Sequence, residues 1–173
     1  MSKTTGMKRI FLSSLIFILF LSCKKEHSSK VEIYMLNSFT RTINQSTNPA
    51  TISITDAVLA DTPLVADEDI RFYTKSTATF KLKKDIKAII QNYGPDKGFA
   101  VTVNKHPVYF GLFHPLYMSS IAYGVVTVSP ESFTKNELKI QFAGMDGSFD
   151  LQQLDKRNDE LLINSLKVSG RLR

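Results

Sequence analysis

The sequence predicts an α+β fold in which a mainly antiparallel sheet has two or three helices packed against it. Short apolar segments recur along the chain, and only a few segments have helical spacing. Two strand-like segments, Gly98–Val103 and residues 108–113, are joined by residues 104–107, which begin with Asn and end with Pro. This spacing is typical of an antiparallel hairpin.

The remaining strands are predicted from their β-branched and aromatic residues and from alternation. They are residues 31–36, 51–54, 77–82, 124–128 and 137–142. Residues 40–48 are rich in Thr, Asn, Gln and Ser and are predicted to form a loop. Residues 143–157 are predicted to be irregular.

Three segments are predicted to be helical. Asp67-Glu68-Asp69 precedes the apolar residues of 70–73, and carboxylates favour a helix N-terminus. Residues 84–93 have apolar residues at helical spacing, and Gly94-Pro95 then ends the segment. Asn158 or Asp159 is placed to cap a last helix, which ends near Gly170.

The first 22 residues have the three parts of a secretory signal peptide. Basic Lys8-Arg9 precedes the apolar residues 10–21, and the small residue Ser22 follows them. The apolar run is too short to cross a hydrocarbon core, which takes about 20 residues. Residues 1–22 are therefore predicted to be a signal peptide, with an uncleaved anchor helix as the alternative.

The only cysteine, Cys23, directly follows this segment. Phe20-Leu21-Ser22-Cys23 resembles a bacterial lipobox, at which the cysteine is lipidated and becomes the first residue of the mature protein. The resemblance implies a lipoprotein of the bacterial cell envelope, in the outer membrane and facing the periplasm or the cell surface. Two or more acyl chains anchor a protein stably where one does not. A plain secretory peptide with a free Cys23 is the alternative.

Residues 23–30 are predicted to be the lipidated cysteine and a polar tether. Residues 31–173 are predicted to form a single domain that is large enough to bury a hydrophobic core. Removing residues 1–22 lowers the formal net charge from +6 to about +3. So mild a charge argues against a nucleic-acid-binding protein. The expected partners are the membrane, through the N-terminal lipid, and an unknown protein or small ligand.

Residues 77–120 resemble the periplasmic head subdomain of the SecD and SecDF protein-export membrane proteins. The shared features are a strand followed by a helix, then an apolar strand that turns tightly into a second one, and finally Pro115 and Ser119-Ser120. Asn104-Lys105 stands where the SecD turn usually has Asp-Gly. Residues 60–70 also resemble the lead-in of small SecD-head-like lipoproteins of unassigned function. The resemblance implies a fold and not protein translocation.

No close-spaced set of metal ligands is present in the sequence. The histidines are His27, His106 and His114, and a zinc site would need the last two at a common edge. Residues 146–157 begin like a calcium loop but have Leu151 and Arg157 where an EF-hand needs Gly and Glu. We therefore expect no metal and no cofactor.

Catalytic patterns are equally weak. Ser119-Ser120 near His114 has the residue types of a nucleophile and its base, but the G-x-S-x-G turn is absent. The carboxylates of Asp67, Glu68 and Asp69 are accounted for by helix capping. The sequence therefore does not predict an enzyme.

The densest aromatic stretch lies in and after the second hairpin strand. Tyr109 and Phe113 share one face of that strand, and Phe110 lies on the other. One face can fill the core while the other stays partly exposed, and exposed Tyr and Met are frequent at recognition surfaces. The candidate binding surface consists of Tyr109, Phe110, Phe113, His114, Tyr117 and Met118.

The sequence thus predicts a lipid-anchored envelope protein with a non-catalytic binding domain. One alternative is an envelope hydrolase whose site is assembled from His114, Ser119 and a carboxylate. The other is an accessory factor of an export or assembly machinery, which rests on fold analogy alone.

Overall fold

The computed structural model describes residues 29–134, 136–144 and 151–173. Within these residues the chain forms two sheets and two α-helices. The larger sheet has the strand order β2-β1-β5-β6-β7-β9, and the smaller sheet has the order β3-β4-β8. Only β6 and β7 pair in parallel, whereas every other pair is antiparallel. The predicted α+β class with mainly antiparallel sheets is therefore confirmed.

The elements have the following bounds. The larger sheet contains β1 (Val31–Asn44), β2 (Thr51–Leu59), β5 (Gly98–Val103), β6 (His106–Phe113), β7 (Val126–Val128) and β9 (Gln141–Phe142). The smaller sheet contains β3 (Ile70–Thr74), β4 (Thr79–Leu82) and β8 (Glu137–Lys139). The helices are α2 (Lys87–Ile90) and α3 (Glu160–Val168). Short 3-10 turns lie at Asp67–Asp69, Lys75–Thr77, Pro130–Ser132 and Gln152–Leu154.

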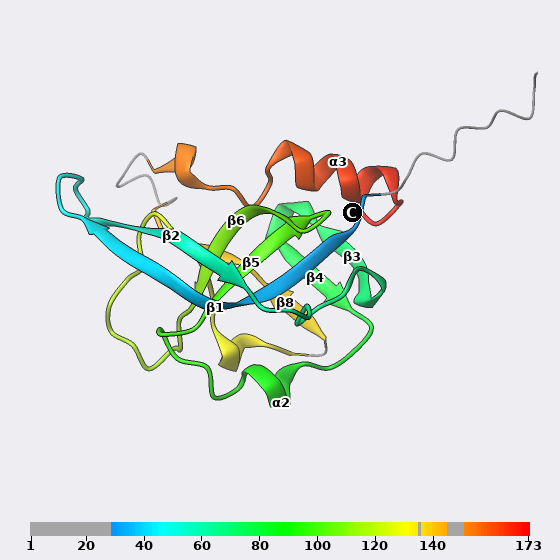
Figure 1. The fold of residues 1–173 in the computed structure, drawn as a ribbon, viewed down its shortest axis with the longest axis horizontal. Helices are drawn as coiled ribbons and strands as arrows, with labels where there is room; N and C mark the ends of the chain where they lie inside the picture. Colours follow the sequence, from blue (N-terminus) through cyan, green and yellow to red (C-terminus); the bar gives the residue numbers. More distant parts are fainter. Residues whose placement is uncertain (1–28, 135, 145–150) are drawn as a thin grey trace, which may run out of the picture.

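The main core lies between the larger sheet, the smaller sheet and α3 (Figure 1). Phe99 and Phe113 come from β5 and β6, and their ring centroids are 5.5 Å apart. Tyr73 and Phe80 of the smaller sheet pack at 4.6 Å. Aromatic pairs at these spacings add about 0.5–1.5 kcal/mol beyond the burial of their area. The main cluster of buried core residues runs from Val31 to Leu166 within the described residues.

The first strand is longer than predicted. Residues 31–36 are mostly buried in the sheet, but β1 continues to Asn44 and pairs with β2 as an arm that extends beyond the body of the sheet (Figure 1). The predicted loop over residues 40–48 is therefore wrong for its first five residues. Thr40, Thr42 and Ile43 are β-branched and find hydrogen-bonded partners in β2, which outweighs the polar composition.

The helix predicted after Asp67-Glu68-Asp69 is also wrong. These residues form one 3-10 turn, and Ile70–Thr74 then pairs with β4 as strand β3. The carboxylates bind elsewhere in the fold. Asp67 Oδ1 accepts hydrogen bonds from the Val31 N–H at 2.7 Å and from Arg171 Nη2 at 2.6 Å, so it joins the start of β1 to the C-terminal segment.

Two other predicted elements are shorter than expected. Only Lys87–Ile90 of the predicted helix 84–93 is helical, with Ile86 and Ile90 buried. The predicted strand 137–142 is divided at Ile140 into β8 and β9, which belong to different sheets. Ile140 is fully buried, and its N–H donates to the carbonyl of Ala78 at 2.9 Å. This tertiary contact directs the chain from the smaller sheet to the larger one.

The last helix is confirmed. Asp159 is its N-cap and accepts a hydrogen bond from the Leu161 N–H at 3.0 Å, and Leu162 and Leu166 enter the core. The predicted signal peptide, Cys23 and most of the tether lie outside the described residues. In the part of the chain that the structure describes, no helix has the length and apolar character needed to span a bilayer.

Candidate functional site

The predicted hairpin is present, with a tighter turn than expected. Val103 pairs with His106, so the connection is the two residues Asn104 and Lys105, both with positive φ. Two such residues form a type I′ turn, whose twist matches that of the flanking strands. This turn fixes the register of β6 and thereby the face on which each of its side chains lies.

Two residues of the predicted binding surface belong to the core instead. Tyr109 and Phe113 are buried, and Phe113 packs edge-on against Tyr93 with ring centroids 5.0 Å apart. They lie on the face of β6 that the smaller sheet and α3 cover, so they cannot form an exposed surface. Phe110, on the opposite face, is half-buried.

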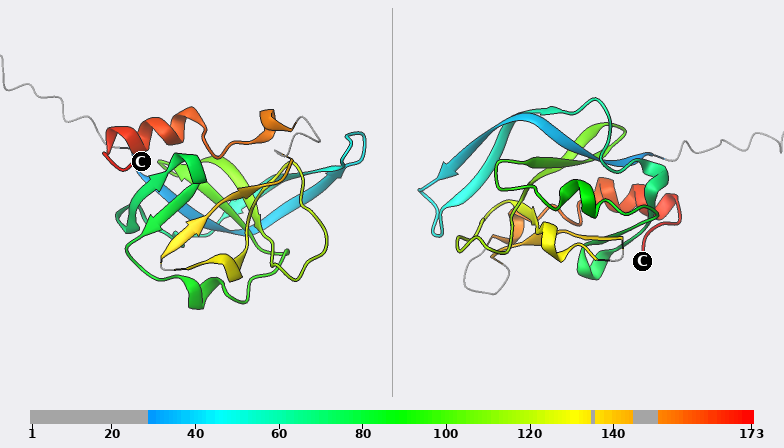
Figure 2. Two further views of the ribbon diagram at one scale, coloured as in Figure 1. Left: turned by 180° about the vertical axis from the view of Figure 1, so that it is seen from behind. Right: turned by 90° about the horizontal axis from the view of Figure 1, so that it is seen from below.

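The chain between β6 and β7 forms an exposed apolar loop, residues 114–123. Leu116, Tyr117 and Ile121 are 65%, 78% and 59% exposed, and Met118 is partly exposed. The loop lies at the opposite end of the molecule from residue 29, where the described chain begins (Figures 1 and 2). The structure therefore retains Tyr117, Met118 and His114 from the predicted surface and adds Leu116 and Ile121.

Hydrogen bonds join the apolar loop to neighbouring residues. His114 Nε2 lies 2.8 Å from the Ser120 carbonyl oxygen, and the His114 carbonyl accepts from Ser129 Oγ at 2.8 Å. The Leu116 N–H donates to Glu131 Oε2 at 3.2 Å. Beneath the loop is a hollow of about 340 Å³, lined by His114, Leu116, Met118, Ile121, Ser129 and Gln141 among others. The loop thus presents apolar side chains beside a concavity.

The histidines do not come together. His106 begins β6 and His114 directly follows its last residue, so the two are about 25 Å apart along an extended strand. In the described residues no group of three His, Cys, Asp or Glu side chains is arranged to hold a metal ion. His114 Nε2 is engaged by the Ser120 carbonyl, so the ring nitrogen is not directed at Ser119. Residues 146–150 of the considered calcium loop lie outside the described residues.

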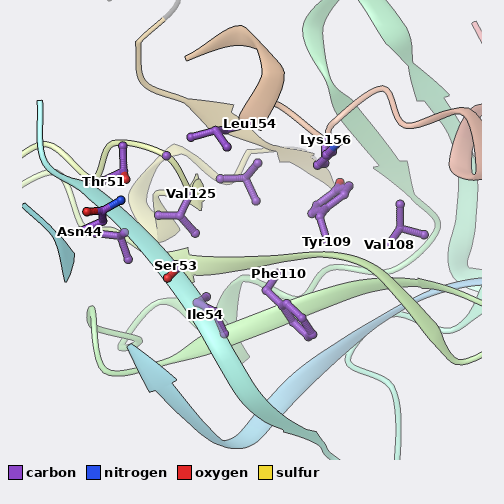
Figure 3. A pocket seen from close by; sticks show the side chains of 13 residues that line it. Asn44, Thr51, Ser53, Ile54, Val108, Tyr109, Phe110, Val125, Leu154 and Lys156 are labelled. Carbon is purple, nitrogen blue, oxygen red and sulfur yellow. The ribbon is translucent and has the colours of Figure 1, made fainter. Parts of the chain in front are cut away.

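A second concavity, which we call the β2–β6 cleft, has a volume of about 400 Å³. It lies between β2 on one side and β6 and β7 on the other, with residues 154–156 along its edge (Figure 3). Apolar side chains form most of its wall: Ile52, Ile54, Val108, Phe110, Val125 and Leu154. Gly124, with φ +78°, is required here, because a Cβ atom would lie 2.7 Å from Thr51 Cβ.

Tyr109 also borders the β2–β6 cleft, and its hydroxyl is unusual. The hydroxyl oxygen is buried and has no hydrogen-bond partner among the described residues. In Figure 3 the ring rises from β6 and its hydroxyl end points toward Lys156. Burial raises the pKa of Tyr109 well above its ordinary value, so the group is a neutral donor at physiological pH.

Residues 154–158 separate the β2–β6 cleft from the opposite surface. Leu154 and Lys156 face the cleft, whereas Asp155 and Arg157 face a different hollow. Asp155 and Arg157 form a two-bond ion pair, Nε to Oδ1 at 2.9 Å and Nη2 to Oδ2 at 2.8 Å. Burial alone would raise the pKa of Asp155, but the hydrogen bonds and charge of Arg157 outweigh it and lower that pKa.

Sequence reasoning missed the β2–β6 cleft because its walls come from distant segments. The sequence predicts strands for residues 108–110 and 124–126, which form part of the wall. Leu154 and Lys156 lie in a segment predicted to be irregular, so their place beside those strands could not be predicted. The start of β2 is joined to the chain before β7 by a hydrogen bond from the Ile52 N–H to the Tyr123 carbonyl at 2.8 Å, and Ile52 packs against Ala122 and Val125. No local pattern in the sequence indicates that contact.

Comparisons of this chain with protein-family models, with curated proteins and with solved structures found no match. The resemblance of residues 77–120 to the SecD head therefore stays a prediction. The functional inference that follows rests on the residues of this chain alone.

Proposed function

We propose that this protein is a lipid-anchored cell-envelope protein whose single domain binds another envelope protein, without catalysis, through the apolar loop. The observation that carries the proposal is the exposure of Leu116, Tyr117 and Ile121 on a loop held by hydrogen bonds. Large apolar side chains grouped on a surface mark interaction sites, whereas single ones do not.

The hydrogen bonds of the apolar loop favour binding, because they restrict its backbone. A loop that is already ordered loses less conformational entropy on association than a flexible one. Tyr117 offers a large ring with few rotatable bonds, which is typical of residues that dominate binding energy. The hollow beneath the loop offers a place for one apolar side chain of the partner.

The position of the apolar loop fits an anchored protein. The described chain begins at the end of the molecule opposite to the loop (Figures 1 and 2). If Cys23 carries the lipid, seven residues separate it from Val31, a reach of about 25 Å when extended. With its first strand toward the membrane, the domain directs the apolar loop toward partners away from that surface.

The anchor is tested by replacing the cysteine. We expect the Cys23→Ala variant to leave the membrane fraction and to lose metabolic labelling with an acyl-chain analogue, because no other cysteine is available for acylation. The wild-type chain should be pelleted with membranes and labelled. A labelled Cys23→Ala variant would contradict the proposal.

Binding through the apolar loop is tested by photo-crosslinking of the full chain in its host cells. A benzophenone side chain placed at Tyr117 should give one discrete adduct with another envelope protein. The same group placed at Val168, which is exposed to a similar extent on α3, serves as the control and should give none.

The adduct at position 117 should disappear when Leu116 and Ile121 are both replaced by Ser. Both side chains are exposed, so the double substitution should change the free energy of unfolding by no more than about 1 kcal/mol. Equal adducts at positions 117 and 168, or an adduct that survives the double substitution, would exclude the apolar loop as the binding surface.

A further inference from the structure

We propose that the β2–β6 cleft binds a single-chain anionic amphiphile, with the apolar chain along the cleft and the acidic head group paired with Lys156. This site is distinct from the apolar loop, and the proposal does not depend on protein binding there. It follows from the lining of the cleft, from its one charge and from the unpaired hydroxyl of Tyr109.

The lining of the β2–β6 cleft suits an alkyl chain. Ile52 and Ile54 of β2 and Val108 and Phe110 of β6 line the cleft with apolar side chains, and Val125, just before β7, adds another. A volume of about 400 Å³ falls within the range of small-molecule sites. A sugar or another polar ligand would leave most of its hydrogen bonds unmade against this wall, which disfavours such ligands.

The charge of the β2–β6 cleft suits an anionic head. Lys156 is the only charged residue among those that line the cleft. It forms no ion pair with any of the described residues. The neighbouring carboxylate of Asp155 faces the opposite side and is bound by Arg157. A carboxylate or phosphate at the cleft edge would therefore meet an ammonium group that is not paired with an acidic side chain of the described residues.

Tyr109 supplies the second polar feature at the Lys156 end. Its hydroxyl is a neutral donor without a partner among the described residues, although almost every buried hydroxyl in proteins has one. Leu154 and Lys156 border the cleft on the same side as this hydroxyl. A head group, or a water that it holds, would complete the hydrogen bonding of Tyr109 there.

Calorimetric titration tests the proposal. The protein starts at position 23 with Cys23→Ser, and it keeps every described residue, including the main cluster of buried core residues. The probes are dodecanoate, dodecyl phosphate and dodecyltrimethylammonium, each below its micelle concentration. We expect at least one of the two anions to bind ten-fold or more tightly than the cation. Preference for dodecanoate indicates a free fatty acid, and preference for dodecyl phosphate indicates a phosphorylated lipid.

Three variants locate the site. Lys156→Glu should reverse the preference between anion and cation, while Lys167→Glu on α3 makes the same charge change away from the cleft and should have no effect. Ser53→Trp should abolish binding of every probe, because the indole ring fills the cleft from an exposed position on β2. Thermal unfolding of each variant verifies that the domain remains folded.

The length of the alkyl chain gives an independent measurement. Affinity should rise two- to four-fold for each methylene group between octanoate and dodecanoate if the chain is buried in the cleft. Equal affinity for the three head groups, an unchanged preference in Lys156→Glu, or no binding by any probe would each overturn the proposal.

Discussion

At the scale of single residues, the hydroxyl of Tyr109 is expected to lower the free energy of unfolding. The buried hydroxyl has no hydrogen-bond partner among the described residues, and such a group loses its hydration on folding without gaining a hydrogen bond in return. Replacing Tyr109 by Phe keeps the ring in the core and removes that cost, so the free energy of unfolding should rise by about 1 kcal/mol. Urea denaturation of the two proteins measures the difference.

Tyr73 provides the matched control for this substitution. Its ring is equally buried, but its hydroxyl donates to the Arg157 carbonyl at 2.8 Å. Tyr73→Phe should therefore lower the free energy of unfolding by about 1 kcal/mol, the opposite sign. If both variants are destabilised alike, the hydroxyl of Tyr109 has a partner in solution.

The candidate surface could be predicted from sequence only in part. The sequence predicts the surface between Tyr109 and Met118, because the density of aromatic residues there is a local property. Which of its members are exposed depends on what covers them. Phe113 is buried by Tyr93 and Phe99, and Tyr117 is left uncovered, and neither outcome follows from residue spacing within the strand.

At the scale of elements, the β5–β6 turn carries conformational strain that can be relieved. Lys105 has φ +65°, a left-handed conformation that costs a side-chain-bearing residue about 1–2 kcal/mol. Gly adopts it without that cost but loses more entropy on folding. Lys105→Gly should therefore raise the free energy of unfolding by about 0.5–1 kcal/mol, as measured in urea.

A control for the turn is another exposed lysine that flanks β5, Lys97, which does not have a positive φ. Lys97→Gly should be neutral or slightly destabilising, because it adds chain entropy without relieving strain. Destabilisation by Lys105→Gly would show that the turn in solution is not of type I′.

Elements determined by contacts between residues near in sequence could be predicted. Elements determined by contacts between distant segments could not. Asp159 caps α3 through a hydrogen bond two residues away, and the hairpin joins neighbouring strands. By contrast, β1 extends to Asn44 because β2 pairs with it. The predicted strand 137–142 is divided at Ile140 because the Ile140 N–H donates a hydrogen bond to the Ala78 carbonyl. Tertiary partners override propensity in both cases.

At the scale of the whole molecule, the two proposed binding features are built differently. The apolar loop makes hydrogen bonds to Ser129 and Glu131 near β7, and its last residue, Tyr123, accepts a hydrogen bond from Ile52 of β2. The β2–β6 cleft depends on that contact of β2 and on residues 154–156. Because the loop and the cleft share this contact, only substitutions away from it, such as those at Leu116, Ile121 or Lys156, should leave binding at the other feature intact.

The stability of the whole domain should fall in acid, and Asp155 contributes to that fall. The folded-state pKa of Asp155 is lowered because Arg157 outweighs the effect of burial, and the pKa of Asp69 is lowered because Lys84, the Ala66 N–H and Lys83 outweigh it. A carboxyl group whose pKa is lower in the folded state stabilises the fold at pH above its unfolded value, about 4. That contribution is lost as the pH falls through the folded-state value.

Asp155→Asn isolates this contribution. At pH 7 the substitution should lower the free energy of unfolding by about 2 kcal/mol, because Arg157 loses a charged hydrogen-bond partner in a largely buried position. The difference from the wild type should shrink as the pH falls below about 4, where the wild-type carboxylate begins to be protonated on unfolding. Asp61→Asn changes an exposed carboxylate and serves as the control. A difference that stays constant from pH 7 to pH 2.5, measured by urea denaturation, would show that Asp155 does not stabilise the fold as a carboxylate.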